Sequence, residues 1–134
     1  MNVLVDTSVW SLALRRNSPR GTPAEMELVE LIREGRVLML GAIRQELLSG
    51  IRSNEQFKKL RDGLRAFSDI VLEEADYEEA ASCFNRCRAK GLQGSNTDFL
   101  ICAVAFRRNA AVLTTDDDFE GFTRVLHVNL HQPR

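Results

Sequence analysis

Short apolar runs alternate along the chain with longer stretches whose apolar residues recur three or four positions apart. The apolar runs lie at 2–6, 37–40, 70–72, 110–114 and 125–128. The intervening periodicity predicts helices. Strands that alternate with helices favour a parallel sheet that is covered on both faces. We therefore expect one α/β domain over residues 1–134, built as a three-layer α/β/α sandwich around a central, mostly parallel, twisted sheet.

The predicted helices have clear start and stop signals. Thr22 can cap a helix, Pro23 suits its first position, and Glu25 completes a capping box. Glycines at 35, 50 and 91 are typical of helix ends. The expected helices include 10–14 and cover 22–34, 42–48, 54–66, 76–90 and 99–106, with loops at 17–21 and 93–96 and a turn at 116–118.

The composition is that of an ordinary globular protein, with 44% hydrophobic residues, 28% charged residues and a net charge of −1 at pH 7. This charge argues against a simple polyanion-binding protein. No apolar run approaches the roughly 20 residues that span a bilayer, and no basic stretch precedes the first apolar run as in a signal peptide. We expect a cytoplasmic protein that has no membrane association. Cys83 and Cys87 are then expected to be buried, reduced thiols.

Four carboxylates fall near the place where ligands bind in open parallel sheets, beyond the carboxyl ends of the strands. These are Asp6, Glu46, Asp98 and Asp116, from four separate segments. Each also has a structural interpretation, as a helix cap, a solvated turn or an exposed helix residue. Asp98 gives the strongest functional signal because it opens the most apolar helix, where a carboxylate needs a partner and no cation is close in sequence.

A cluster of carboxylates without His or Cys ligands selects a hard cation, Mg²⁺ or alternatively Mn²⁺. Such a site supports metal-assisted phosphodiester hydrolysis, which needs no protein nucleophile. The sequence offers no Ser–His–Asp or Cys–His arrangement, and His127 and His131 are interpreted as structural or surface residues. Basic side chains that could contact phosphate, although a solvated charged face is the simpler interpretation of each, are Arg15, Arg16, Arg44, Arg52, Lys58 and Lys59.

Four motifs surround the four acids: VDTSVW at 5–10, QEL at 45–47, TDFLICAVA at 97–105 and LTTDDDF at 113–119. In their order, and over essentially the whole chain, they resemble the motifs of PIN domains, specifically the VapC-like toxins. The resemblance places metal ligands on Asp6, Asp98 and Asp116 and a fourth catalytic acid on Glu46. It leaves open whether Asp118 shares the role of Asp116 or caps the next helix.

This resemblance implies a magnesium-dependent endoribonuclease, the toxin of a type II toxin–antitoxin system, which hydrolyses RNA by metal-activated water. Asp6, Asp98 and Asp116 would hold the ion, the last directly or through water, and Glu46 would position or deprotonate the attacking water. The hydroxyl groups of Thr7, Ser8 and Thr115 would orient the acids. The implied partners are an RNA substrate, a VapB-like antitoxin and a second copy in a homodimer. Exposed apolar surface on the helices after Gly21 would dock the antitoxin.

The alternatives are another enzyme, a phosphoaspartyl phosphatase, and a non-enzymatic protein, either a response-regulator receiver or an inert interaction module. A phosphoaspartyl phosphatase needs a second Asp two residues after the first, where Ser8 stands, and a late Lys, whereas none follows Lys90. A response-regulator receiver needs an acidic pair after its first strand and also a late Lys. A PIN-like interaction module without catalytic activity remains the other alternative, because a complete set of acids does not prove turnover.

Overall fold

In the computed structural model, which describes residues 1–14 and 21–134, four strands form one parallel sheet in the order β2–β1–β3–β4. The strands are β1 (Val3–Val5), β2 (Val37–Leu38), β3 (Ala111–Leu113) and β4 (Asn129–Leu130). β1 and β3 are buried along their whole length. Their register pairs Val5 with Leu113, so the residues that follow the two central strands lie side by side.

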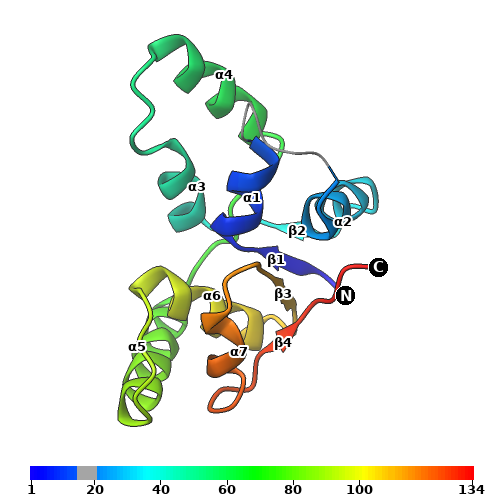
Figure 1. Cartoon of the computed structure of the whole chain (residues 1–134). Coiled ribbons are helices and arrows are strands. Elements are labelled where there is room, and N and C mark those ends of the chain that lie inside the picture. The colour runs from blue at the N-terminus through cyan, green and yellow to red at the C-terminus, as the bar shows by residue number, and fades with distance from the viewer. Residues whose placement is uncertain (15–20) are drawn as a thin grey trace.

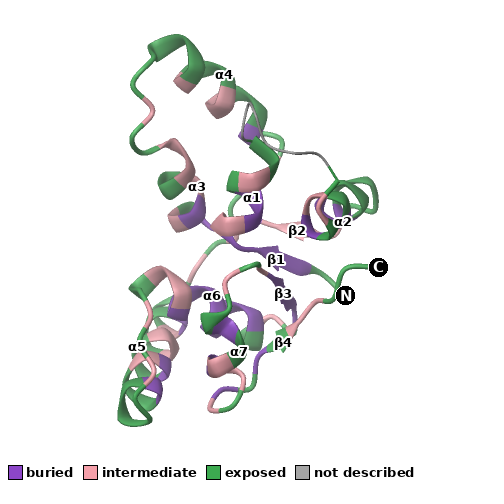
Figure 2. Ribbon diagram, in the orientation of Figure 1, coloured by how far each residue is buried: buried purple, intermediate pink, exposed green. Residues whose placement is uncertain are grey.

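Helices cover both faces of the sheet, as expected for a three-layer α/β/α sandwich (Figure 1). One layer contains α1 (Thr7–Leu14), α2 (Pro23–Arg33), α3 (Gly41–Leu48) and α4 (Asn54–Leu64). The other contains α5 (Glu74–Ala89), α6 (Asn96–Arg107) and α7 (Asp118–Phe122). Buried residues concentrate on β1, β3 and α6, which lie at the centre of the molecule (Figure 2).

The helix signals in the sequence correspond to real caps. The Thr22 hydroxyl accepts a hydrogen bond from the backbone N–H of Glu25 at 3.3 Å, and Pro23 is the first residue of α2. Gly35 follows α2 with a φ of +67°, a conformation that favours glycine. In α6, every residue from Phe99 to Ala105 is buried, which confirms the prediction that this helix is surrounded by the core.

Two predicted strands are wrong. Residues 70–72 make only one ladder contact, in which the Ile70 N–H donates to the Met39 carbonyl at 2.9 Å. Val71 is 85% exposed and its neighbours Ile70 and Leu72 are only partly buried, so this apolar triplet does not form a core strand. The segment 125–128 is irregular because its buried residues, Leu126 and Val128, pack in turns that follow α7. The strand itself forms later, at Asn129–Leu130.

The loop that precedes α6 depends on a close approach of backbone to aromatic rings. A Cβ added at Gly94 would stand 2.7 Å from Cζ of Phe122 and 3.1 Å from the ring of Phe99. Both rings are buried, so neither can move aside, and only glycine fits there. This packing fixes the entry of the chain into α6.

The predicted loop at 17–21 lies, apart from Gly21, outside the described residues. Among the described residues, no helix has the length and apolar character needed to cross a bilayer.

Candidate active site

Asp6 directly follows β1 and is only 5% exposed. The Ser8 hydroxyl and the Thr114 hydroxyl each donate a hydrogen bond to Oδ2 of Asp6, both at 2.8 Å. Within the described residues, Oδ1 accepts no hydrogen bond and no basic side chain forms an ion pair with this carboxylate. Asp6 is therefore a buried charge that is oriented by hydroxyl groups but not neutralised by the protein.

Thr114 connects the ends of the two central strands. Its Oγ1 donates to Asp6 and accepts from the backbone N–H of Asp116 at 3.0 Å. The Asp116 carboxylate in turn accepts from the N–H of Asp118, the first residue of α7, at 2.9 Å. The motif analysis did not assign a role to Thr114, although the register of β1 and β3 places it beside Asp6. Asp118 itself is exposed and does not act as a cap.

Asp98 combines the structural and the functional interpretation that the sequence left open. It forms a capping box with Ser95, in which the Ser95 N–H donates to Asp98 Oδ2 at 2.9 Å and the Asp98 N–H donates to the Ser95 hydroxyl at 3.1 Å. Burial raises the pKa of Asp98, hydrogen bonds from Ser95 oppose this, and the negative charges of Asp6 and Asp116 raise it further. The three aspartates thus share one electrostatic environment.

Glu46 lies apart from this trio, on the exposed side of α3. It lines an open hollow of about 490 Å³ together with Ala42, Gln45 and Ser49 of its own helix. The other wall of the hollow is formed by Thr7 and Thr97, the neighbours of Asp6 and Asp98 in the sequence. The structure therefore brings Asp6, Asp98 and Asp116 together and places Glu46 across an adjoining hollow from two residues beside them.

The chemistry of these side chains fits a hard divalent cation. All the donors are carboxylate or hydroxyl oxygens, and Asp6 is buried without a protein cation. Over residues 1–14 and 21–134, the side chains as they stand form no group of three or more His, Cys, Asp or Glu residues that could hold an ion. An ion at this edge of the sheet would have to draw the carboxylates closer, which their mutual repulsion opposes until a cation is bound.

The candidate phosphate contacts have different outcomes. The Arg44 guanidinium is fully engaged, because it donates to the Asp69 carboxylate and to the backbone carbonyls of Leu64 and Phe67. It holds α3 to the end of α4, so these contacts would have to break before Arg44 could bind a phosphate. Arg52, Lys58 and Lys59 are exposed, so their role stays a prediction. Arg15 and Arg16 lie outside the described residues.

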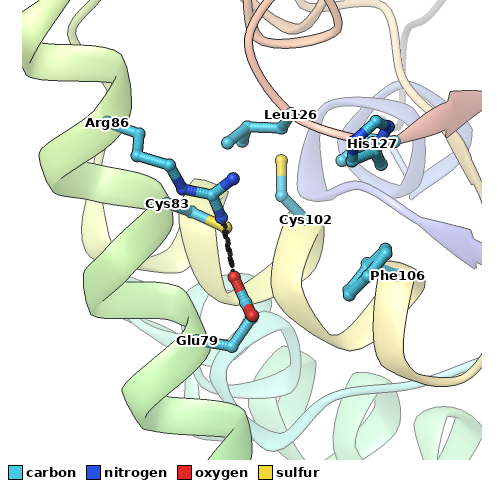
Figure 3. Close-up of a pocket in the computed structure, with 8 residues that line it drawn as sticks. Glu79, Cys83, Arg86, Cys102, Phe106, Leu126 and His127 are labelled. Carbon is cyan, nitrogen blue, oxygen red and sulfur yellow. Dashed lines mark hydrogen bonds and ion pairs between the residues drawn. The ribbon is translucent and has the colours of Figure 1, made fainter.

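A second hollow, of about 90 Å³, lies between α5, α6 and residues 126–128, and two thiols line it (Figure 3). Cys83 and Cys102 face it, and Arg86 pairs with Glu79 at 2.7 Å along its wall. Burial raises the pKa of Cys83 to about 11, so this thiol is protonated at neutral pH. Both are free, as is Cys87, which confirms the prediction of buried, reduced cysteines and gives this hollow no nucleophile.

The chain is similar to known proteins over nearly its whole length. The family model for the PIN domain matches residues 3–125. The chain is 28% identical over 130 residues to the VapC ribonuclease Mb1587 of Mycobacterium bovis and to the ribonuclease VapC11 of Mycobacterium tuberculosis, covering 94% of this chain and 95% of each relative.

Solved structures share the fold. VapBC2 from Rickettsia felis, bound to a DNA fragment from its promoter, matches this chain with a TM-score of 0.77 at 21% identity. The match covers 98% of this chain and 98% of that chain. FitAcB from Neisseria gonorrhoeae has a TM-score of 0.76 at 21% identity, covering 98% of this chain and 97% of that chain. At this level of identity, the likeness establishes the α/β fold.

Proposed function

The chain belongs to the PIN-domain family, and from that premise we propose that it is a metal-dependent endoribonuclease, the toxin of a toxin–antitoxin module. The observation that carries the proposal is the buried carboxylate of Asp6, which shares one electrostatic environment with Asp98 and Asp116 and pairs with no cation among the described residues. Two relatives that match nearly the whole chain bear the name ribonuclease, which supports RNA as the substrate.

Each residue of the site has a defined part in this proposal. Ser8 and Thr114 fix one oxygen of Asp6 and leave the other free to bind. Asp6, Asp98 and Asp116 would hold Mg²⁺ or Mn²⁺. When bound, that ion supplies Lewis-acid polarisation of the scissile phosphate and lowers the pKa of a water.

Glu46 would position the attacking water or accept its proton as the water oxygen bonds to phosphorus, and the 3′ oxygen departs with the electrons of the broken P–O bond and takes a proton from solvent. Its exposure on α3 leaves its carboxylate accessible for that transfer. The phosphatase alternative is disfavoured, because it needs a second carboxylate at position 8. Ser8 stands there instead, and its hydroxyl donates to Asp6.

The first test removes one charge from the trio. Asp98→Asn keeps an oxygen for the capping box with Ser95, so the fold should persist while RNA cleavage in Mg²⁺ falls by at least about 100-fold. Asp117→Asn is the matched control, because Asp117 is an exposed acid in the same region and is not one of the four. Undiminished cleavage by Asp98→Asn, or cleavage by the wild type in excess chelator, would refute the metal mechanism.

A second test does not use activity. A cation that binds only the folded chain stabilises it by mass action, so MgCl₂ or MnCl₂ should raise the melting temperature of the wild-type protein at constant ionic strength. Asp98→Asn should lose most of that increase. An equal increase in both proteins would place the binding elsewhere in the molecule.

The antitoxin belongs to the same proposal, supported by the several solved relatives that are toxin–antitoxin complexes. An apolar groove of about 590 Å³ runs between α1 and α4 and is a suitable site for an amphipathic segment. Trp10 lines it with a buried indole N–H that has no partner among the described residues. The predicted exposed apolar surface after Gly21 is also present, at Met26, Val29 and Ile32 of α2.

Co-purification with the product of the adjoining open reading frame tests the groove. Leu60→Glu introduces a charge into it and should prevent co-purification, whereas Glu55→Gln on the exposed surface of α4 should not. Retention of the partner by Leu60→Glu would exclude this groove.

Homodimer formation is proposed on the resemblance to VapC-like toxins. Sedimentation of the isolated chain over a range of concentrations tests it, and a monomer at every concentration would contradict it.

A further inference from the structure

The hollow beside the aspartates has one wall made by a single face of α3. Ala42, Gln45, Glu46 and Ser49 are spaced three and four residues apart, so their side chains project from the same side of the helix. The opposite wall belongs to the first turns of α1 and α6, through Thr7 and Thr97. The space between the two walls is about 490 Å³ and is widely open to solvent.

The lining of the hollow suits a neutral polar group better than a phosphate. No Lys or Arg lines it, and its only charge is the negative one of Glu46. A phosphate there would meet repulsion from that carboxylate and find no cation. Amide and hydroxyl groups, in contrast, offer donors and acceptors of the kind that bind the edges of nucleobases.

The hollow also adjoins the site of reaction. Thr7 is bonded to Asp6 and Thr97 to Asp98 along the chain, so a group seated between them lies next to the phosphate that the aspartates would engage. We propose that the hollow binds an unpaired nucleobase adjacent to the scissile phosphate and that Gln45 determines which base is accepted. This inference rests on the proposed ribonuclease function and adds the origin of its sequence preference.

Gln45 is the residue best suited to discriminate between bases. Its side chain is exposed and has no partner among the described residues, so its amide offers both a donor and an acceptor. The Ser49 hydroxyl already donates to the Gln45 backbone carbonyl at 2.7 Å and can only accept from a ligand. Glu46 can only accept, and the Thr7 hydroxyl is buried without a partner.

A base that is read in this way must be unpaired. Its Watson–Crick edge has to face Gln45, and a complementary strand would occupy that edge. The expected substrate is therefore a single-stranded segment or loop, and annealing the same RNA to its complement should abolish both cleavage and base preference at that position.

The experiment is cleavage of an RNA pool with a randomised single-stranded segment, followed by sequencing of the product ends. The wild-type protein should show a preferred base at one position beside the cut. A bidentate amide contact discriminates by about 5- to 100-fold, and Gln45→Ala should reduce the preference to about 2-fold or less. Gln45→Glu loses the amide donor but keeps the acceptors, so it should change the preferred base to one that presents amino groups. Gln132→Ala, an exposed glutamine of the C-terminal tail, is the control and should retain the wild-type preference.

The outcomes separate the two proposals. Wild-type cleavage with no preference beside the cut, or an identical preference in Gln45→Ala and in the wild type, overturns the inference and leaves the ribonuclease proposal intact. Wild-type cleavage no faster than that of Asp98→Asn overturns the ribonuclease proposal and this inference with it. Preference that is lost in Gln45→Ala and altered in Gln45→Glu supports both.

Discussion

Two buried carboxylates at different ends of the molecule have opposite surroundings. Asp76, near the start of α5, is fully buried and receives hydrogen bonds at 2.8–2.9 Å from Arg107 and Arg108 at the end of α6. Asp6, at the end of β1, is nearly as buried, but its side chain accepts hydrogen bonds from only two hydroxyl groups. The first charge is neutralised within the fold and fastens two helices together, whereas the second is oriented without being neutralised.

This difference separates structural from functional acids. Among the described residues, the only other buried charged side chain is Glu27 of α2, which is held by His131 and Arg134 of the C-terminal segment. A buried charge without a counter-charge costs several kcal/mol, so a fold retains one only where something else compensates it. The comparison therefore predicts that Asp6 matters for ligand binding and catalysis and that Asp76 and Glu27 matter for stability.

The largest expected effect is that of Asp6→Asn. The amide keeps an oxygen for Ser8 and Thr114 but removes the charge, so RNA cleavage should fall by at least about 100-fold. The free energy of unfolding, measured with urea in the absence of divalent ions, should stay equal or increase, because repulsion with Asp98 and Asp116 disappears. A large loss of stability would place Asp6 with the structural acids and break the comparison.

Asp76→Asn should give the reverse pattern. Removing this charge leaves Arg107 and Arg108 without their carboxylate at the contact between α5 and α6, and the free energy of unfolding should fall by about 3 kcal/mol. Cleavage per folded molecule should remain at the wild-type value. Loss of cleavage in a variant that is shown to be folded would contradict the separation of roles.

The pH dependence of stability separates the wild type from Asp76→Asn in a second way. Hydrogen bonds from Arg108 lower the pKa of Asp76 from 3.8 to about 2, although burial opposes them. Because the folded-state pKa is depressed, the stabilisation is complete above the unfolded value and disappears as the pH falls from about 4 to about 2. Asp76→Asn should lose about 2 kcal/mol less than the wild type over that interval.

The sequence predicted most of the helices and the central strands in their order, because these depend on local patterns, and three of the four acids that it singled out lie together in the fold. The apolar residues of β1 and the Thr22–Pro23 start of α2 act within one turn or strand. The strand at 129–130 was missed because pairing with β3, and not local apolarity, decides it. Thr114 was missed for the same reason, since its contact with Asp6 spans 108 positions in the sequence.

Thr114→Val should sharpen the account of Asp6. The change is close in shape but removes the hydroxyl that orients Asp6 and accepts from Asp116. Loss of such a supporting hydrogen bond typically reduces metal affinity or activity by about 10- to 100-fold. Thr114→Ser restores the hydroxyl and should recover most of the activity. The apparent affinity for Mg²⁺ should change in parallel with activity, which a loss of packing alone would not produce. Equal activity in the Val and Ser variants would show that Thr114 is not part of the site.

The smallest expected effect is that of Arg134→Ala, at the other structural acid. Burial raises the pKa of Glu27, but hydrogen bonds from His131 and Arg134 outweigh it and hold that pKa below its usual value. Arg134 is 52% exposed in its side chain, and its contact with Glu27 is longer than that of His131, 3.2 Å against 2.5 Å. Solvent screens such a pair, so urea unfolding should show only a small loss of stability, well below that of Asp76→Asn. A loss as large as that of Asp76→Asn would mean that His131 alone cannot hold Glu27. A half-exposed arginine would then stabilise a buried acid as well as the two less exposed arginines around Asp76 do.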